Sequence, residues 1–401
     1  MLQISYLRLG GMYAESADAA ILLRTALERV LDLQRVRPTL AAFVELQAGI
    51  SLQLAGCSAQ AQQAYNASYQ WAQVSGKHFL MADAAGKLAL ACALDGKHEE
   101  ARQWLSLHAQ AIEEVAWGRK MLERGAELTR AYQALNELDV NSARALLENL
   151  PQAPDSDEFW VVHTYLLALC KVHEGIPEAA RSLVATMLEE RKHAGSALTI
   201  RMLDDASKLI GILDAGSIRA ALDPRLEPNV LTALQYFIDE RPDEALSVVE
   251  QEPPEAGSRR WASLLKYLKL VARHPGKPSP ELLQQVARLY RDSGNLFELS
   301  LLLRIPQWSG ARNLLGLTPE ELLRLDSSGT FDRVQTGPRP RLTAREQEIL
   351  QQLRAGMSRR EIAEAGFRSE NTVKTQVRSL YRKLNASDLS QALENARFWG
   401  L

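Results

Sequence analysis

The sequence is poor in cysteine. Its three cysteines, Cys57, Cys92 and Cys170, lie far apart and include no C-x-x-C pair. An odd and scattered set of thiols argues against a disulfide framework or a zinc site, and it fits a reducing cytoplasm. A chain of 401 residues can bury a large apolar core, so it needs no cross-links to fold.

Long apolar runs are also missing. No stretch reaches about 18 uninterrupted apolar residues, the length that a membrane helix requires. Residues 1–11 show no basic segment followed by a long apolar run, as a secretory signal peptide would. The sequence therefore predicts a cytoplasmic protein without a membrane span.

Signatures of catalysis and of metal binding are absent from the sequence. It contains no G-x-S-x-G, no H-E-x-x-H and no phosphate-cradling G-x-x-x-x-G-K-[ST]. No pair of its seven histidines has i,i+4 spacing with a third ligand nearby. We therefore expect no enzyme, no metal and no other cofactor, and no control by ATP within these residues.

What the sequence does contain is helical periodicity along nearly its whole length. Apolar residues recur at spacings of three and four, and alternation of β-branched residues is almost absent, which predicts an all-α fold. Clusters of Gly and Pro mark loops at 151–154, 252–257, 274–280 and 336–340. The last cluster is the best domain boundary. We expect a helical body over 1–335, a linker over 336–341 and a second domain over 342–401.

The body contains a degenerate repeat, in which a helix end, a polar turn and a second helix recur. It covers residues 52–65, 92–105, 135–147, 171–184 and 236–249, with a small residue at Ala61, Ala101, Ala143, Ala180 and Ala245. In three of them, at Gly56, Gly96 and Gly175, a glycine precedes the alanine by five residues. A small residue lets two helices approach closely, and glycine allows the left-handed conformation that ends the first helix. Such pairs stack into a solenoid.

This body resembles tetratricopeptide-like repeats. An ordinary helical bundle with alanine-rich turns is the alternative interpretation. No repeat can be placed from 195 to 229. We expect Trp104, Trp160, Trp261 and Trp308 to pack in the core. The basic stretch 259–269 is interpreted as a solvated helix face, with a partner or DNA contact as the second choice.

Charge is distributed unevenly between the two parts. Residues 338–401 hold twelve Lys and Arg against seven Asp and Glu, whereas the rest holds 35 basic and 42 acidic residues. A basic module on an acidic body is typical of a domain that meets a polyanion.

Within this module, the caps predict four helices. Thr343 with Glu346 and Ser358 with Glu361 have the spacing of capping boxes, and Ser369 and Ser387 are plausible further N-caps. The helices are expected near 344–354, 359–365, 370–384 and 388–398. The short second helix, the tight turn after it and the longer third helix together predict a helix-turn-helix.

The third helix has two distinct faces. Its apolar stripe consists of Val373, Val377, Leu380 and Leu384, and Ala363 is small where the second helix would cross it. Its other face carries Thr372, Lys374, Thr375, Arg378 and Arg382. Lys and Arg can donate to guanine O6 and N7, and a Thr methyl can touch thymine, so this face suits a major groove.

These motifs resemble the LuxR-type helix-turn-helix regulators. The matching elements are Leu342-Thr-x-Arg-Glu-x-Glu-Ile-Leu350, Gly356-x-Ser358, Glu361-Ile-Ala363, Thr372-Val-Lys374 and the Tyr-Arg-Lys-Leu ending at Leu384. The ungapped match spans about sixty residues, about 15% of the chain. A helical-repeat body ahead of such a module is similar to the large MalT-like members, although the upstream ATPase is not in this chain.

The resemblance implies a role for each exposed position. It implies base reading by Lys374, Thr375 and Arg378. It implies phosphate contacts from Arg359, Arg360, Asn371, Thr372 and Arg382. It also implies dimerisation through the fourth helix, around Leu389, Ala392, Leu393 and Ala396. Gly366 and Arg368 stand where the family has apolar residues, which should loosen the turn, and Leu389 replaces a common Arg.

Taken together, the sequence predicts a DNA-binding transcriptional regulator, with activation favoured. Its expected partners are double-stranded DNA, a second copy of the chain on DNA, RNA polymerase if it activates, and an unidentified small-molecule or protein effector in a concave groove of the body. The alternative is a helical-repeat adaptor whose helix-turn-helix binds DNA weakly or not at all.

Overall fold

The computed structural model of this chain is helical throughout its described part. The structure describes residues 2–29, 37–150, 158–190, 195–214, 229–251, 259–274, 276–327, 342–354, 357–366 and 369–384, and also 386, 389, 392, 393 and 396. No strand occurs within these ranges, which confirms the all-α prediction. Among the helices of the same residues, none has the length and apolarity to cross a bilayer.

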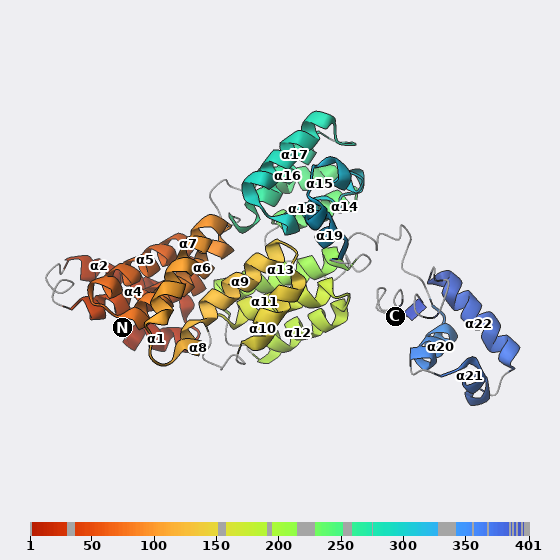
Figure 1. Cartoon of the computed structure of the whole chain (residues 1–401), viewed down its shortest axis with the longest axis horizontal. Helices are drawn as coiled ribbons and strands as arrows, with labels where there is room; N and C mark the ends of the chain where they lie inside the picture. Colours follow the sequence, from red (N-terminus) through yellow and green to blue (C-terminus); the bar gives the residue numbers. More distant parts are fainter. Residues whose placement is uncertain are drawn as a thin grey trace.

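The body begins with helices that pair along the chain (Figure 1). They are α1 (Leu2–Leu9), α2 (Tyr13–Arg29), α4 (Pro38–Leu54), α5 (Ser58–Val74), α6 (His78–Leu94), α7 (His98–Glu113), α8 (Arg119–Leu122), α9 (Arg124–Asn136), α10 (Val140–Asn149), α11 (Trp160–His173), α12 (Pro177–Glu190) and α13 (Ala197–Leu213). The pairs α4–α5, α6–α7, α9–α10 and α11–α12 pack as hairpins, so four predicted repeats are confirmed as helical hairpins.

The remaining helices of the body form a second group, drawn in green and teal in Figure 1. They are α14 (Val230–Ile238), α15 (Pro242–Gln251), η1 (Arg259–Trp261), α16 (Ala262–Arg273), α17 (Pro280–Ser293), α18 (Leu296–Leu302), η2 (Pro306–Trp308), η3 (Arg312–Leu314) and α19 (Pro319–Ser327). The fifth repeat is the hairpin of α14 and α15. In the stretch 195–229, where no repeat was recognised, the structure describes residues 195–214 and 229, and these include the helix α13.

All five hairpins share one turn geometry. The residue five positions before the repeat alanine has a positive φ in each: +83° at Gly56, +73° at Gly96, +58° at Leu138, +80° at Gly175 and +57° at Glu240. The next backbone N–H donates to the carbonyl five residues earlier, as in Cys57 to Leu52 at 2.8 Å and Arg241 to Tyr236 at 2.8 Å. This bond ends the first helix.

The repeat alanines explain how the two helices of a hairpin meet. Each of the five has no exposed surface. A larger side chain there would force the helices apart, because a packed interior has little spare volume. The sequence signal therefore marked the small residue in all five turns and the glycine in three of them.

The first helices of successive hairpins also contact one another. α4 packs against α6, α6 against α9, α9 against α11 and α11 against α13, and α13 also meets α4. A Cβ atom added to Gly56 would lie 3.4 Å from the Cβ of Ala197, so the first turn adjoins the start of α13. An ion pair of 3.4 Å joins Arg8 of α1 to Glu158. The helices α4, α6, α9, α11 and α13 therefore form one closely packed side of the body.

Tryptophan placement agrees with the core prediction, but the basic stretch does not. Trp160, Trp261 and Trp308 are buried, and Trp104 is half-buried with its ring 5.3 Å from that of Tyr69 in an edge-on contact. Arg260 is buried too. The interpretation of this stretch as a solvated face is therefore wrong at its start, where a 3-10 turn directs Arg260 and Trp261 inward.

Candidate nucleic-acid interface

The C-terminal module has its own small core. Its helices are α20 (Ala344–Arg354), α21 (Arg359–Ala365) and α22 (Glu370–Lys383), and they enclose an apolar cluster separate from the core of the body. These bounds confirm three of the four predicted helices. The described residues bring together no group of three or more His, Cys, Asp or Glu side chains that could hold a metal.

Two capping boxes start α20 and α21, as predicted. The Thr343 hydroxyl accepts from the backbone N–H of Glu346 at 3.3 Å, and the Thr343 N–H donates to the Glu346 carboxylate at 2.8 Å. Ser358 and Glu361 make the same reciprocal pair, at 3.3 and 2.7 Å. These bonds satisfy N–H groups that have no partner inside the helix.

The start of α22 is fixed by Ser369. Its hydroxyl accepts from the backbone N–H of Thr372 at 3.2 Å, which confirms the predicted N-cap. The plausible N-cap at Ser387 and the turn position Arg368 lie outside the described residues.

The buried side of α22 holds the helix-turn-helix together. Val373, Val377, Leu380 and Leu384 are each at most 2% exposed, which confirms the predicted stripe. Ala363 on α21 is buried in the same cluster. Because one side of α22 is buried against α20 and α21, the opposite side must face outward.

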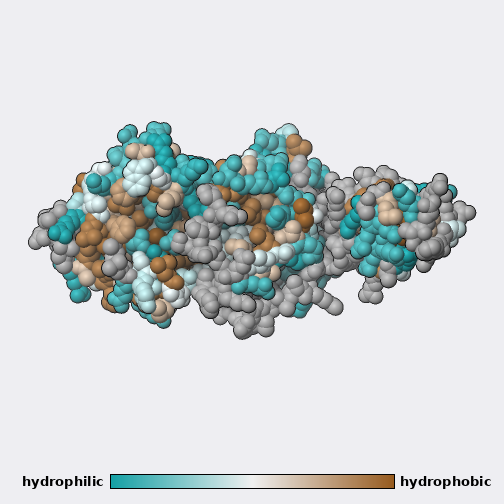
Figure 2. All heavy atoms as spheres, turned by 90° about the horizontal axis from the view of Figure 1, so that it is seen from below, coloured by the Kyte–Doolittle hydropathy of each residue, from teal (hydrophilic) through white to brown (hydrophobic). Residues whose placement is uncertain are grey.

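The outward side of α22 carries the residues proposed to meet DNA. Thr372, Lys374, Thr375, Arg378 and Arg382 are all exposed. Lys374, Thr375, Arg378 and Arg382 stand at spacings of one, three and four along the helix, so they form one row roughly opposite the apolar stripe. In Figure 2 the described surface of the module, at the right, is mostly hydrophilic.

The structure places the other proposed contacts less completely. Arg359 is exposed in the first turn of α21. Arg360 and Asn371 lie in α21 and α22, but their side chains lie outside what the structure describes. Three arginines or lysines of α22 thus share one face, and Arg359 adds a cation from the neighbouring helix.

Lys383 is basic as well, but it has a different task. Its ammonium group lies 2.6 Å from the Glu346 carboxylate, which also accepts from the Ser379 hydroxyl at 3.1 Å. Burial raises the pKa of Glu346, but the hydrogen bonds from Lys383 and Thr343 outweigh it and lower the pKa below its ordinary value. Sequence reasoning missed this contact, because 37 residues separate its partners.

Gly366 turns out to make room for an arginine. A Cβ atom at this position would lie 2.6 Å from Nη2 of Arg345, whose other terminal nitrogen pairs with Glu348. The guanidinium therefore lies against the turn, where the resemblance led us to expect an apolar side chain. We expected a looser turn from the sequence alone, before this contact between Arg345 and Gly366 was known.

The fourth helix is described at only a few positions. Leu389, Ala392, Leu393 and Ala396 are all helical. Ala392 and Ala396 are at most 1% exposed and belong to the core of the module, whereas Leu389 is 41% exposed and Leu393 is partly buried. Two of the four residues assigned to dimerisation therefore pack inside a single chain, which narrows that prediction to Leu389 and Leu393.

Such an arrangement can do a limited set of things. A rigid helix that projects cations and hydroxyl groups offers hydrogen-bond donors to phosphates and to base edges. The exposed row includes no carboxylate, since Glu370, the acidic residue of α22, lies at its first turn and outside the row. The geometry suits a helix that enters a groove of a polyanion.

Comparison with known proteins agrees with this geometry. Residues 340–396 match the family described as bacterial regulatory proteins, luxR family. The chain is 50% identical over 52 residues to the probable csgAB operon transcriptional regulatory protein of Salmonella typhimurium and to the CsgBAC operon transcriptional regulatory protein of Escherichia coli. It is 49% identical over 51 residues to the uncharacterized transcriptional regulatory protein YxjL of Bacillus subtilis.

These matches concern the module alone. Each covers 13% of this chain and 23–24% of the relative, so the chain spans about a quarter of the length of the curated relatives it matches. No solved structure matches the chain significantly. The family match and the geometry coincide over α20, α21 and α22, and residues 340–396 therefore form a helix-turn-helix domain of the LuxR type.

Proposed function

We propose that this protein is a transcriptional regulator that binds double-stranded DNA in a sequence-specific manner through α22. The observation that carries the proposal is the exposed row of Lys374, Thr375, Arg378 and Arg382 opposite the buried stripe of the same helix. The match of residues 340–396 to a family of bacterial regulators supports it. On this proposal the chain acts by binding, not as an enzyme.

The residues of the interface divide by their expected contacts. Lys374 and Thr375, in the first half of α22, and Arg378, near its middle, read base edges in the major groove. Thr372, Asn371 and Arg382, with Arg359 and Arg360 of α21, contact phosphates and fix the register on the duplex.

We further propose that two copies act together on a two-part DNA site, through the fourth helix at Leu389 and Leu393. Leu389 supports this step, because it is helical and 41% exposed, so it offers apolar surface to a second copy. If the regulator activates transcription, RNA polymerase is its further partner.

The body, tetratricopeptide-like in its hairpins, then serves as the effector- or partner-binding part of a cytoplasmic regulator related in layout to the MalT-like proteins. Its support is the helical hairpin architecture alone, since stacked hairpins present extended surfaces that bind ligands.

The test is salt-dependent DNA binding by the full chain. Sequences are first selected from a random DNA pool, and the affinity for the selected site is then measured between about 50 and 200 mM salt. A regulator with four to six phosphate contacts should lose roughly 10²–10³ in affinity over that interval. A chain without affinity for any duplex at low salt would refute the proposal and favour an adaptor.

A control variant that removes a cation outside the row separates the row from general electrostatics. The double variant Lys374→Ala and Arg378→Ala should abolish binding to the selected site. Arg354→Ala removes one cation from α20, outside the row, and should leave binding within about threefold of the wild type.

A further inference from the structure

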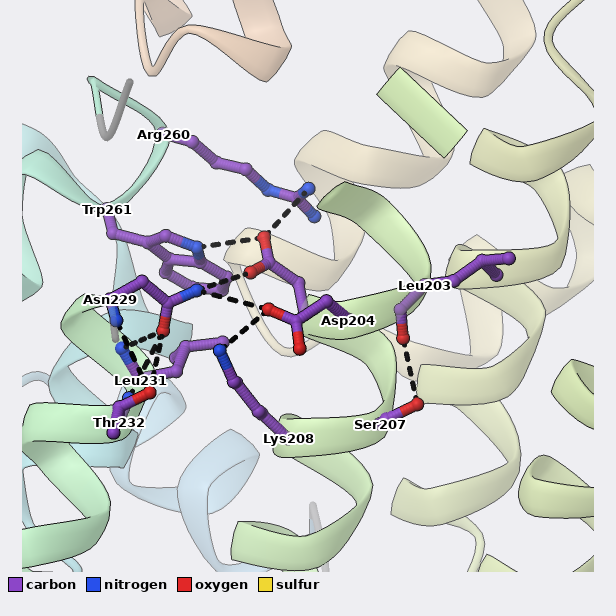
Figure 3. Close-up of polar contacts among 10 residues, drawn as sticks. Leu203, Asp204, Ser207, Lys208, Asn229, Leu231, Thr232, Arg260 and Trp261 are labelled. Carbon is purple, nitrogen blue, oxygen red and sulfur yellow. Dashed lines mark hydrogen bonds and ion pairs between the residues drawn. The ribbon is translucent and has the colours of Figure 1, made fainter. Parts of the chain in front are cut away.

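Arg260, in the short turn η1, directs a buried cation into the body. Its guanidinium carbon lies 4.2 Å from the ring centroid of Tyr165 on α11 and 5.6 Å from that of Tyr132 on α9. Its Nη1 atom lies 3.4 Å from the Asp205 carboxylate on α13. Figure 3 labels Arg260 and Trp261 and draws Asp205 without a label. Arg260 is 7% exposed, and Asp205 is 2% exposed. The cation of Arg260 is thus enclosed by α9, α11 and α13, which precede η1 in the chain.

The chemistry of this enclosure is specific for a planar cation. Aromatic faces attract a guanidinium by stacking and through their quadrupole, and a carboxylate supplies the counter-charge. The same carboxylate accepts from the indole N–H of Trp261 at 3.1 Å. Burial raises the pKa of Asp205, although Arg260 and Trp261 act in the opposite direction.

The position of this site in the fold is informative. Tyr132, Tyr165 and Asp205 belong to α9, α11 and α13, which contact one another in succession, and α6 also contacts η1. The turn η1 therefore lies on the side of the body that α6, α9, α11 and α13 form. In a repeat protein such a shared side is the natural ligand surface, and here the chain itself covers it.

Stability alone gives a weak reason for this arginine. Two of its nitrogens, Nε and Nη2, make no hydrogen bond of good geometry among the residues that the structure describes, although the hydroxyl groups of Tyr132 and Tyr165 interact with the guanidinium. Leaving buried donors unsatisfied is unfavourable, and an ion pair inside a protein often stabilises less than apolar residues of the same volume. A tethered side chain cannot reorient to satisfy all its donors, whereas a free ligand can.

We propose that Tyr132, Tyr165 and Asp205 form a guanidinium-binding site of the body, and that the chain's own arginine is its resident occupant. A guanidinium compound competes with Arg260 for the two rings and the carboxylate. The exchange loosens the attachment of the α14–α19 segment, which precedes the DNA-binding module. Naming this compound as the effector rests on the proposed function, whereas its binding to the body does not.

The experiment empties the site in the full chain and refills it. The variant Arg260→Ala is unfolded by heat while ethylguanidinium is titrated at millimolar concentrations, with ethylammonium as a cation that lacks the planar fork. Ethylguanidinium at ten times its Kd should raise the Tm by roughly 2–4 °C, and ethylammonium should not. A Tm that does not respond to ethylguanidinium would overturn the proposal.

Two further measurements keep the result decisive. Arg304 also ties the later segment to α13, because it donates to the carbonyl of Ile212 at 3.1 Å, so Arg304→Ala is a matched variant. Its Tm should not rise with ethylguanidinium, and an equal rise would overturn a specific site. If Arg260→Ala does not fold alone, its folded fraction by circular dichroism is followed instead, and no gain with ethylguanidinium would reject the site.

Two probes distinguish whether the natural guanidinium belongs to a small molecule or to a protein segment. Argininamide represents a small molecule, and the dipeptide Arg-Trp represents a protein segment like residues 260–261. Binding of either one to Arg260→Ala supports the shared chemistry, and failure of both contradicts it. Because these measurements use no DNA, a chain that binds guanidinium but no duplex would refute only the proposed regulator.

Discussion

The ammonium group of Lys383 lies 2.6 Å from the carboxylate of Glu346 and ties the end of α22 to the start of α20. The same carboxylate closes the capping box of α20 by accepting from the backbone of Thr343 at 2.8 Å. One buried side chain thus fixes both the first turn of α20 and the far end of the helix proposed to enter DNA. The orientation of α22 depends on this contact as well as on its apolar stripe.

Replacing Glu346 should therefore loosen α22 locally. Glu346→Ala removes charge-assisted hydrogen bonds and leaves their donors without this partner, which should cost about 1–3 kcal/mol of module stability. Hydrogen exchange measured by mass spectrometry should show faster exchange along α22 and unchanged exchange in the body. Glu348→Ala is the control, since its side chain is 51% exposed and its expected effect is below about 0.5 kcal/mol.

The same carboxylate predicts a dependence on pH. The pKa of Glu346 is lowered in the folded chain, so the unfolded chain binds the proton more readily. The stabilisation is therefore complete above the unfolded pKa of about 4.3 and is lost as the pH falls through the lower folded value. The protection of α22 against hydrogen exchange should fall below about pH 4 in the wild type and should fall less in Glu346→Gln.

The hairpin turns of the body allow a second prediction. Glu240 has a φ of +57°, a conformation that disfavours every residue with a Cβ atom, and its side chain is exposed. Glu240→Gly should stabilise the body by about 0.5–1 kcal/mol, because relief of strain exceeds the entropy that glycine adds to the unfolded chain. Gly96→Ala, in the equivalent turn, should destabilise it by about 1 kcal/mol. Both are measured by chemical denaturation.

Leu138 provides the control for this prediction. It has nearly the same φ, +58°, but its side chain is only 4% exposed. Leu138→Gly relieves the same strain and removes a buried side chain, so it should destabilise the body by about 2 kcal/mol or more. If Leu138→Gly and Glu240→Gly were both stabilising, burial would not be what retains leucine in this turn.

These turns show where sequence reasoning succeeds and where it fails in the body. The alanines predicted all five hairpins, because close helix approach needs a small residue at that one position. The glycine signal covered only three turns, since Leu138 and Glu240 adopt the same conformation despite its strain. No repeat could be placed from 195 to 229, the stretch that contains the helix α13.

In the module, the prediction from sequence was more complete. Caps and the period of a helix depend on residues three to eleven positions apart, so Ser358, Ser369 and the stripe of α22 were recognisable directly. Contacts between distant segments were not. Lys383 with Glu346, and Arg260 with Asp205, each join residues far apart in the chain, and nothing in their local sequence indicates the partner.

Glu298 leads to a third prediction, on the pH dependence of the body. This buried carboxyl on α18 accepts from the backbone N–H of Leu264 at 2.5 Å and from the Asn295 amide at 2.8 Å. Burial nevertheless raises the pKa of Glu298 to about 8. Between about pH 4.3 and 8 the folded chain holds a proton that the unfolded chain releases, so stability should fall as the pH rises through this window.

The measurement is urea denaturation of the full chain at pH 5.5, 7 and 8.5. The free energy of unfolding of the wild type should fall by up to a few kcal/mol across this series. That of Glu298→Gln, which stays neutral, should fall less. Glu244→Gln replaces an exposed carboxylate on α15 and should reproduce the wild-type slope. Equal slopes for Glu298→Gln and the wild type would show that another group governs the dependence.

The row on α22 yields the last prediction, which distinguishes base reading from phosphate binding. Arg378 lies in the middle of α22 and Arg382 in its last turn, and both are exposed. If Arg378 reads a base, Arg378→Ala should cost about 1–3 kcal/mol on the selected site and relax the preference at one base pair. Arg382→Ala should weaken all duplexes alike and reduce the slope of log affinity against log salt by about one. Binding to a panel of single-base variants of the site, at two salt concentrations, separates these patterns. Uniform loss with Arg378→Ala would assign that arginine to the backbone and leave Lys374 and Thr375 as the residues to test for base reading.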